Sequence, residues 1–326
     1  MLYGPRDLRL KDVSIPRPLS GWCLIKTKAV GICGTDKAFY LGTYPLFKKP
    51  LIPGHEVVGE VVEGPEDLIG RRVIPEINFS CGRCYYCRVG LYTHCPYKKT
   101  LGIDFDGGMA EFFIAPVEAL HLAEDLDPII GVEVEPLAAV LNMFEQYPPT
   151  PTMKVAVIGS GNLAILTVQV LKLLGVDELV VIVRRGSVKH RYIRQLGAVT
   201  IYLDEIEDYV KKNTPEGQGF DMVIEATGSN KGLEIAVKIT KPRGIIHIKS
   251  TPGGLAEFNQ TLAVVKELRI IGTRCGAFKE FKRAIELLAR GHVKPIITST
   301  VGLKQGELAF EKALEKEQVK VVIVNK

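Results

Sequence analysis

Residues 153–164 read MKVAVIGSGNLA, a short apolar run followed by a glycine-rich turn and by residues suited to a helix. The turn has the pattern G-x-G-x-x-A: Gly159 allows a tight turn, Gly161 lets the backbone approach a pyrophosphate, and the small Ala164 lets helix and strand pack closely. A pyrophosphate there would meet the positive end of the helix dipole. We therefore expect a dinucleotide site whose cofactor-binding residues are Gly159, Gly161, Asn162 and Leu163.

The alternation of strand and helix continues on the C-terminal side of this turn. Apolar runs typical of buried strands recur within residues 178–185, 219–229 and 243–251, with helical patterns between them. Strands that alternate with helices indicate a parallel sheet covered on both faces, so we expect a doubly wound α/β fold over residues 131–275.

The first 125 residues have a different texture. Their apolar runs are short, alternate with period two and are broken by Gly and Pro, which indicates a β-rich domain. Near the C-terminus, Phe278, Phe281, Ile285 and Leu288 have helical spacing and are expected to pack in a core, and VKVVIV at 319–324 predicts a final strand. A chain of 326 residues suits two domains.

Composition narrows the class of protein. The chain is 46% hydrophobic and 24% charged, and its net charge of +5 is spread along the sequence, which does not favour nucleic-acid or membrane binding. Charges interrupt the N-terminal segment where a secretory signal needs an apolar run, and no run reaches the roughly 18 apolar residues of a membrane span. We expect a cytoplasmic protein.

Residues 80–95 read SCGRCYYCRVGLYTHC and hold four of the seven cysteines, Cys81, Cys84, Cys87 and Cys95. The spacing C-x2-C-x2-C-x7-C lets tight turns direct successive sulfurs at one ion, and four thiolates leave no open position. We expect a structural zinc site that holds a loop together. A redox dithiol is the alternative, but redox C-x-x-C pairs are expected near the start of a helix.

Two arginines follow the second strand of the predicted sheet. An NAD site usually has Asp or Glu at this point to hold the ribose hydroxyls, whereas here the strand runs into Arg184 and Arg185. Guanidinium groups pair with a 2′-phosphate through two hydrogen bonds, so NADP is the expected cofactor. A solvated loop, or use of both NADP and NAD, is the alternative.

Three further fragments carry metal-ligand residue types. GICGTD contains Cys33, PGHEVVG contains His55 and Glu56, and VEVEPLA contains Glu135. Taken singly, each has an ordinary structural interpretation as a buried thiol, a satisfied histidine or a charge at a helix start.

Taken together, these fragments make the chain resemble the zinc-dependent medium-chain dehydrogenase/reductase family. GICGTD, GHEVVGEVVE, the four-cysteine segment, DGGMAEFF, EPLA, GSGNLA and EATGS occur in the family's order along nearly the whole chain. The resemblance implies a GroES-like catalytic domain built from residues 1–130, which carry the zinc lobe, and from 276–326. The Rossmann domain at 131–275 is then inserted between these two parts.

The resemblance also implies roles for single residues. Cys33 and His55 would ligate a catalytic zinc, and Glu56 and Glu135 would share the remaining coordination; which carboxylate binds at rest stays open. Thr35 matches the position whose hydroxyl passes the substrate proton outward. Many relatives continue this relay with a histidine where this chain has Ala38, so the onward route is undetermined.

Two hydroxyl residues complete the candidate site. In the family, Thr227 lies near the nicotinamide half of the cofactor and Ser250 lies where backbone meets its carboxamide. Ordinary strand-end hydroxyls are the alternative for both.

These features predict an enzyme with one catalytic and one structural zinc. It would oxidise a secondary alcohol, polyol or aldose by hydride transfer to NADP, as in the glucose dehydrogenase branch. Threonine or sorbitol dehydrogenase-like activity with NAD is an alternative within the family. A non-catalytic NADP-binding or redox-sensing protein is an alternative of another class. By resemblance we expect a homodimer or homotetramer.

Overall fold

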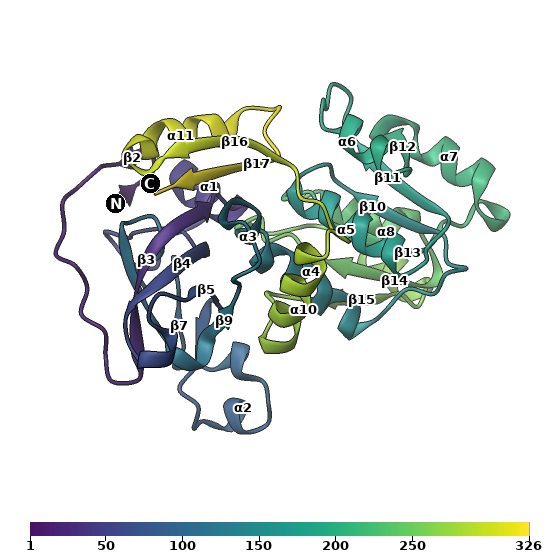
Figure 1. Cartoon of the computed structure of the whole chain (residues 1–326). Coiled ribbons are helices and arrows are strands. Elements are labelled where there is room, and N and C mark those ends of the chain that lie inside the picture. The colour runs from purple at the N-terminus through teal and green to yellow at the C-terminus, as the bar shows by residue number, and fades with distance from the viewer. Residues whose placement is uncertain (326) are drawn as a thin grey trace. The chain divides into compact units, whose positions relative to one another are not determined.

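The computed structural model describes residues 1–325, which form two compact units (Figure 1). The first unit contains Met1–Ala138 and the segment from Cys275 onward, and the second unit is Ala139–Arg274. The chain thus leaves the first unit, builds the second and returns. Among the described residues, no helix combines the length and the apolar character needed to cross a membrane.

The second unit is built on a six-stranded, wholly parallel sheet of order β12-β11-β10-β13-β14-β15. This is the 3-2-1-4-5-6 order of dinucleotide-binding folds, so the predicted doubly wound fold is confirmed. Its strands are β10 (Val155–Ile158), β11 (Leu179–Val183), β12 (Val199–Tyr202), β13 (Phe220–Glu225), β14 (Thr240–Ile248) and β15 (Arg269–Gly272). Every residue of β10 and β11 is buried, as expected for strands covered on both faces.

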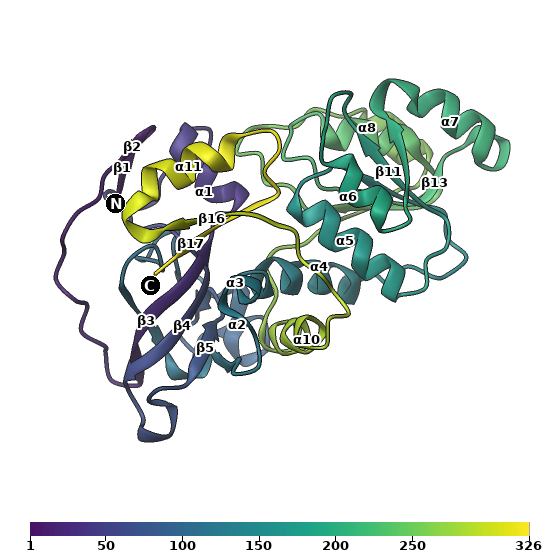
Figure 2. The ribbon, with the colours of Figure 1, turned by 45° about the horizontal axis from the view of Figure 1, so that its top comes forward.

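Five helices flank this sheet: α5 (Asn162–Leu173), α6 (His190–Gln195), α7 (Ile206–Asn213), α8 (Gly232–Ile239) and α9 (Gln260–Val265). α5 contacts α6, whereas α8 contacts α7 and α9. Figure 2 shows α5 and α6 on one side of the sheet and α8 on the other.

The first unit contains a seven-stranded sheet of order β16-β17-β3-β4-β5-β9, with β8 paired to β3. Its strands are β3 (Trp22–Gly31), β4 (Glu56–Glu63), β5 (Arg72–Pro75), β8 (Phe112–Pro116), β9 (Leu120–Leu122), β16 (Ile297–Gly302) and β17 (Lys320–Val324). Two small ribbons join β1 (Leu2–Gly4) to β2 (Asp7–Leu8) and β6 (Asn78–Phe79) to β7 (Lys99–Thr100).

Helices of the first unit are short apart from α10. They are α1 (Gly34–Leu41), α2 (Tyr85–Arg88), α3 (Pro128–Gly131), α10 (Phe278–Ala289) and α11 (Gly306–Leu314), while α4 (Val134–Gln146) runs from the first unit into the second. The 3₁₀ turns are η1 (Glu66–Leu68), η2 (Tyr92–His94), η3 (Val117–Ala119), η4 (Leu203–Glu205), η5 (Pro215–Gly217) and η6 (Leu303–Gln305).

The pairing of β17 with β3 places the end of the chain beside its beginning (Figure 1). Gly31, the last residue of β3, lies opposite Val322 on β17 and opposite Glu56 on β4. Side chains from three distant parts of the sequence therefore meet at this end of the sheet.

Helix α10 forms as the spacing predicted, but its apolar stripe is not uniformly buried. Phe281 and Leu288 are buried, whereas Phe278, the first residue of the helix, is 56% exposed. The core-packing prediction is therefore wrong at Phe278, because its ring lies 5.2 Å from the His121 ring, between centroids, at the border of a pocket described below.

Candidate functional site

Cys33 lies where β3 gives way to α1, at the N-cap position of the helix. Its extended backbone directs its N–H to Oδ2 of Asp36 at 2.8 Å, so Asp36 caps the helix and fixes the turn that carries the thiol. Asp36 is fully buried, which makes this cap part of the core.

His55 and Glu56 reach the same place from the start of β4. A Cβ at Gly54 would lie 2.8 Å from side-chain atoms of Met109 and Val30, and φ is +99° there, so only glycine suits this entry to the strand. Glycine is also required at position 31 on β3, since a Cβ there would collide with Oε2 of Glu56.

These elements bring three predicted ligands together. One ligand atom each from Cys33, His55 and Glu56 lies within 4.8 Å of the others. His55 is 4% exposed and Glu56 1%, so the group is sheltered from bulk water while the Cys33 side chain is only partly covered. Sulfur, imidazole nitrogen and carboxylate oxygen form a donor set that suits zinc with a position left for substrate.

The polar atoms around this group suit a cation. Nδ1 of His55 and Oδ1 of Asp36 are buried and lack hydrogen-bond partners, and they lie 3.8 Å apart. Burial alone would lower the pKa of His55, but the charges of Cys33 and Asp36 raise it well above its usual value. The surroundings therefore favour positive charge at this point, which is the condition that a bound metal ion satisfies.

Lys320, the first residue of β17, is a member of this site that the sequence analysis missed. Its side chain is 2% exposed; Nζ lies 2.5 Å from Oε2 of Glu56 and 3.8 Å from Oε1 of Glu133. Burial would lower the pKa of Lys320, but the carboxylates of Glu133 and Glu56 outweigh burial and raise it. A lysine inside the apolar run VKVVIV was the available signal, because a buried lysine requires a partner.

Glu135 lies in the first turn of α4 and is 7% exposed. It is not part of the close three-residue group, although its charge helps to raise the pKa of His55. The structure therefore brings Glu56 to the ligand group directly and keeps Glu135 at its border.

Thr35 is placed beside the thiol, with its Oγ1 3.9 Å from Sγ of Cys33. Lys37, two residues further along α1, carries a pKa that burial lowers and that the charge of Cys33 partly restores. Ala38 offers no group that could carry a proton.

The four-cysteine segment folds into a lobe around α2 and η2. One sulfur from each of Cys81, Cys84, Cys87 and Cys95 lies within 4.8 Å of the others. Sγ of Cys84 is 3.5 Å from that of Cys87 and 3.8 Å from that of Cys95, and all four cysteines are free. A zinc tetrahedron with Zn–S bonds of about 2.3 Å has S···S edges of about 3.8 Å, so these sulfurs fit zinc.

The thiols of the lobe differ in acidity. Hydrogen bonds from the backbone N–H groups of Arg83 and Cys84 lower the pKa of Cys81 to about 6. The N–H of Cys87 favours the Cys84 thiolate, but burial and the adjacent sulfurs prevail and raise the pKa of Cys84 to about 11. Four thiolates this close need a divalent cation to coexist.

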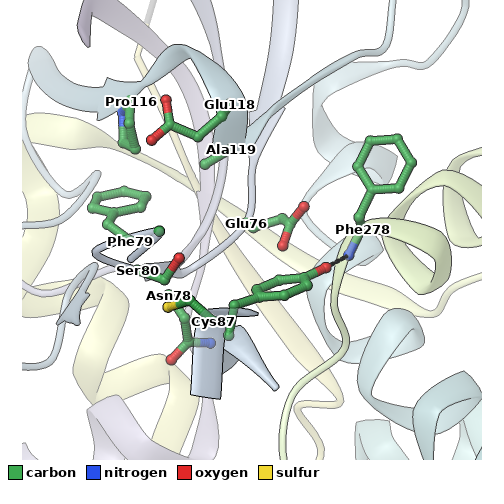
Figure 3. A pocket seen from close by; sticks show the side chains of 11 residues that line it. Glu76, Asn78, Phe79, Ser80, Cys87, Pro116, Glu118, Ala119 and Phe278 are labelled. Atoms are coloured by element: carbon green, nitrogen blue, oxygen red, sulfur yellow. Dashed lines mark hydrogen bonds between the residues drawn. The ribbon is translucent and has the colours of Figure 1, made fainter. Parts of the chain in front are cut away.

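A pocket of about 310 Å³ lies between the lobe and α10, and Figure 3 shows the side chains that line it. Oη of Tyr92 accepts a hydrogen bond of 2.7 Å from the backbone N–H of Phe278 across this pocket. Glu76 also lines the pocket and accepts a 3.0 Å hydrogen bond from Nε2 of His121. The lobe is thus tied to α10, which agrees with a structural role for it.

The glycine turn of the second unit has the geometry that its sequence predicts. Gly159 has φ of +130°, and a Cβ there would lie 2.5 Å from the carbonyl oxygen of Ala226. Gly161 is the N-cap of α5 and faces open space, while Ala164 is fully buried. No side chain caps α5, so the N–H groups that begin at Asn162 and Leu163 are available to a phosphate.

Arg184 and Arg185 are both exposed at the end of β11, but they differ in what they contact. Arg185 donates 2.6 Å hydrogen bonds to Asp204 and to Glu205 and stacks over the ring of Tyr202 at 4.5 Å. The hydrogen bond to Asp204 is the main reason that the pKa of Arg185 is raised. Among residues 1–325, no ion pair is formed by Arg184.

Comparison with known proteins shows the family to which the chain belongs. Residues 19–125 match the family model described as the alcohol dehydrogenase GroES-like domain, and residues 163–290 match the zinc-binding dehydrogenase model. An alcohol dehydrogenase of Geobacillus stearothermophilus is 32% identical over 98% of this chain and 96% of its own length. Other relatives are named for D-arabitol phosphate, sorbitol and L-threonine.

Solved structures agree with this assignment. A zinc-binding dehydrogenase of Sinorhizobium meliloti bound to NADP has a TM-score of 0.88 at 28% identity, covering 99% of this chain and 97% of that one. The alcohol dehydrogenase rspB of Escherichia coli, complexed with NADH, has a TM-score of 0.89 with the same identity and coverage. The resemblance inferred from the motifs is confirmed: the chain is an oxidoreductase of the zinc-dependent medium-chain dehydrogenase/reductase family.

Proposed function

We propose that this enzyme oxidises a secondary alcohol, polyol or aldose with NADP as the preferred hydride acceptor. The observation that carries the proposal is the sheltered group of Cys33, His55 and Glu56, with one ligand atom each within 4.8 Å. Zinc held there would act as a Lewis acid that lowers the pKa of a substrate hydroxyl.

The chain's own residues supply the remaining functions. Asp36 fixes the turn of Cys33 through its Oδ2, and its Oδ1 faces Nδ1 of His55 at 3.8 Å, where the negative charge favours a cation bound by the imidazole. The hydroxyl of Thr35 is placed to receive the substrate proton, and with Ala38 next along the helix we infer that water carries it onward. Lys320 holds Glu56 by its Oε2, leaving Oε1 as the oxygen that can reach a metal.

A screen of purified enzyme against secondary alcohols, polyols, aldoses and L-threonine, with NADP and with NAD, tests the function. We expect about two zinc ions per chain, one per donor set, and faster reduction of NADP than of NAD with a polyol or an aldose. Faster turnover of L-threonine with NAD would replace the proposed substrate class. If protein with both zinc sites filled shows no turnover, the proposed activity is contradicted and a non-catalytic NADP-binding or redox-sensing function is favoured.

The cofactor preference depends on whether Arg185 binds the 2′-phosphate of NADP or stays paired with Asp204 and Glu205. A 2′-phosphate must compete with these two carboxylates for the Arg185 guanidinium. Arg184 forms no ion pair among residues 1–325, so a phosphate would bind it without such competition. We expect the double substitution Asp204→Asn with Glu205→Gln to tighten NADP binding about three- to tenfold, because exposed ion pairs are weak and their loss frees the arginine.

The measurement is the dissociation constant of each dinucleotide by fluorescence titration. NAD serves as the internal control, since it lacks the 2′-phosphate and its affinity should stay within about twofold of the original value. Equal shifts for NADP and NAD would show that the arginines do not read the phosphate.

Assembly is expected to involve the second unit. We infer a homodimer or homotetramer formed through β15, the edge strand of the parallel sheet, where Ile270 is 36% exposed. An open edge with an apolar side chain is suited to pairing with a second copy.

A further inference from the structure

Glu225 ends β13 and is buried to 2% exposure. Its Oε1 accepts three hydrogen bonds: from the N–H of Thr227 at 2.8 Å, from the hydroxyl of Thr227 at 2.5 Å, and from the hydroxyl of Ser250 at 3.0 Å. One carboxylate oxygen thus joins the chain segments that follow two neighbouring strands, β13 and β14.

The two hydroxyls have no hydrogen left to donate. A hydroxyl has a single donor hydrogen, and both Thr227 and Ser250 give theirs to Glu225. Each also accepts: Thr227 from the N–H of Ser229 at 2.9 Å, and Ser250 from the N–H of Gly228 at 2.7 Å. Donation from these hydroxyls to a cofactor would require this network to break, so they hold the loop rather than the nicotinamide.

The network lies next to the dinucleotide turn. Glu225 is in register with Ile158, the residue before Gly159, and the carbonyl oxygen of Ala226 lies against Gly159. This is the point between β10 and β13 where the strand order reverses, and open α/β sheets bind their ligands there. A shift of residues 226–229 would therefore move one wall of the cofactor site.

The buried carboxylate of Glu225 must be stabilised by its surroundings. Among the residues that the structure describes, no lysine or arginine forms an ion pair with Glu225, and an ionised carboxylate is costly to bury without a cation. Hydrogen-bond donors and the start of α8 at Gly232, whose missing Cβ makes room for Oε1, are what stabilise it. An apolar residue would avoid this cost but could not accept the three bonds.

We propose that Glu225 is a positioning residue for the nicotinamide dinucleotide: it fixes the loop 226–229 and the Ser250 turn without touching the cofactor. The inference rests on the proposed use of such a dinucleotide. It predicts equal effects on NAD and NADP, because the five hydrogen bonds of the network join only Glu225, residues 227–229 and Ser250, and not the arginines that follow β11.

The test compares Glu225→Ala with Glu225→Gln in the full-length, zinc-loaded enzyme. We expect Glu225→Ala to raise the dissociation constants of NAD and NADP by about tenfold or more, since three hydrogen bonds to a charged acceptor are lost. Glu225→Gln retains an acceptor oxygen, so its constants should stay within about threefold of the original.

Glu280→Ala is the matched control. Glu280 is also buried and accepts a backbone hydrogen bond, from Ala277 at 2.9 Å, but it lies in the first unit. It should leave both constants unchanged, so a loss of affinity confined to Glu225→Ala identifies positioning rather than general destabilisation. Ser250→Ala, which removes one of the three bonds, replaces Glu225→Ala if that variant does not fold, with an expected loss of about threefold.

Two results would overturn the inference: unchanged affinity in Glu225→Ala, or an equal loss in Glu225→Gln, which would assign the effect to charge alone. Binding by the unaltered enzyme is measured first. Failure there would contradict the proposed function, whereas the ratio of variant to unaltered enzyme tests Glu225 by itself.

Discussion

Replacing Cys33 by serine is expected to lower turnover about a thousandfold or more while leaving dinucleotide affinity within about twofold. Cys33 supplies the one sulfur of the three-residue group, and zinc contributes several kcal/mol of charge stabilisation that disappears with the metal. At about 1.4 kcal/mol per factor of ten, a loss of about 4 kcal/mol gives this effect. The dinucleotide turn lies in the second unit and keeps its residues.

Metal content and turnover of the same preparation measure this effect. Zinc should fall from about two ions to about one per chain, because the four-cysteine lobe is untouched. Cys23→Ser is the matched control: Cys23 is buried on β3 but lies outside both ligand groups. A Cys33→Ser enzyme that retains turnover would show that this group does not perform the chemistry, as the non-catalytic alternative requires.

Replacing Lys320 by methionine is expected to lower the free energy of unfolding of the first unit by about 3–5 kcal/mol in zinc-free protein. The ammonium group pairs with Glu56 and faces Glu133, so its replacement removes a buried cation that compensates buried carboxylates. The double substitution with Glu56→Gln should recover about half of the loss, because the closest of the uncompensated charges is then gone. Zinc-loaded protein should lose less, since the metal faces the same carboxylate.

Trp22 makes this measurement specific. It is the only tryptophan of the chain and begins β3, the strand that pairs with β17, so its fluorescence during denaturant unfolding reports on the first unit. Lys28→Met is the control, because the pair of Lys28 with Glu60 is partly exposed and should contribute less than about 1 kcal/mol. A change of similar size in both variants would contradict the role assigned to Lys320.

Much of the fold could be predicted from local sequence. The turn after β10 needs Gly159 for its positive φ angle and Gly161 for the open space in front of its backbone. Both glycines lie in the same short stretch of sequence, so a local motif identifies them. The four thiols were equally predictable, because their spacing within sixteen residues determines how they meet. Features that depend only on residues close in sequence can be predicted without knowledge of the rest of the fold.

The features that the sequence analysis missed depend on distant contacts. Lys320 meets Glu56 across 264 positions of sequence through the pairing of β17 with β3, and no local pattern describes that pairing. Arg185 was expected to face a phosphate, but its partners Asp204 and Glu205 follow a different strand. Thr227 and Ser250 were considered as cofactor contacts singly, whereas the structure joins them through Glu225.

The most direct test of the central claim is anomalous X-ray scattering at the zinc edge from crystals of fully metallated enzyme. We expect two peaks per chain, one among the four cysteines of the lobe and one bound by Cys33 and His55 with a glutamate oxygen. A peak in the lobe alone, with no metal at Cys33 and His55, would contradict a catalytic zinc at this site.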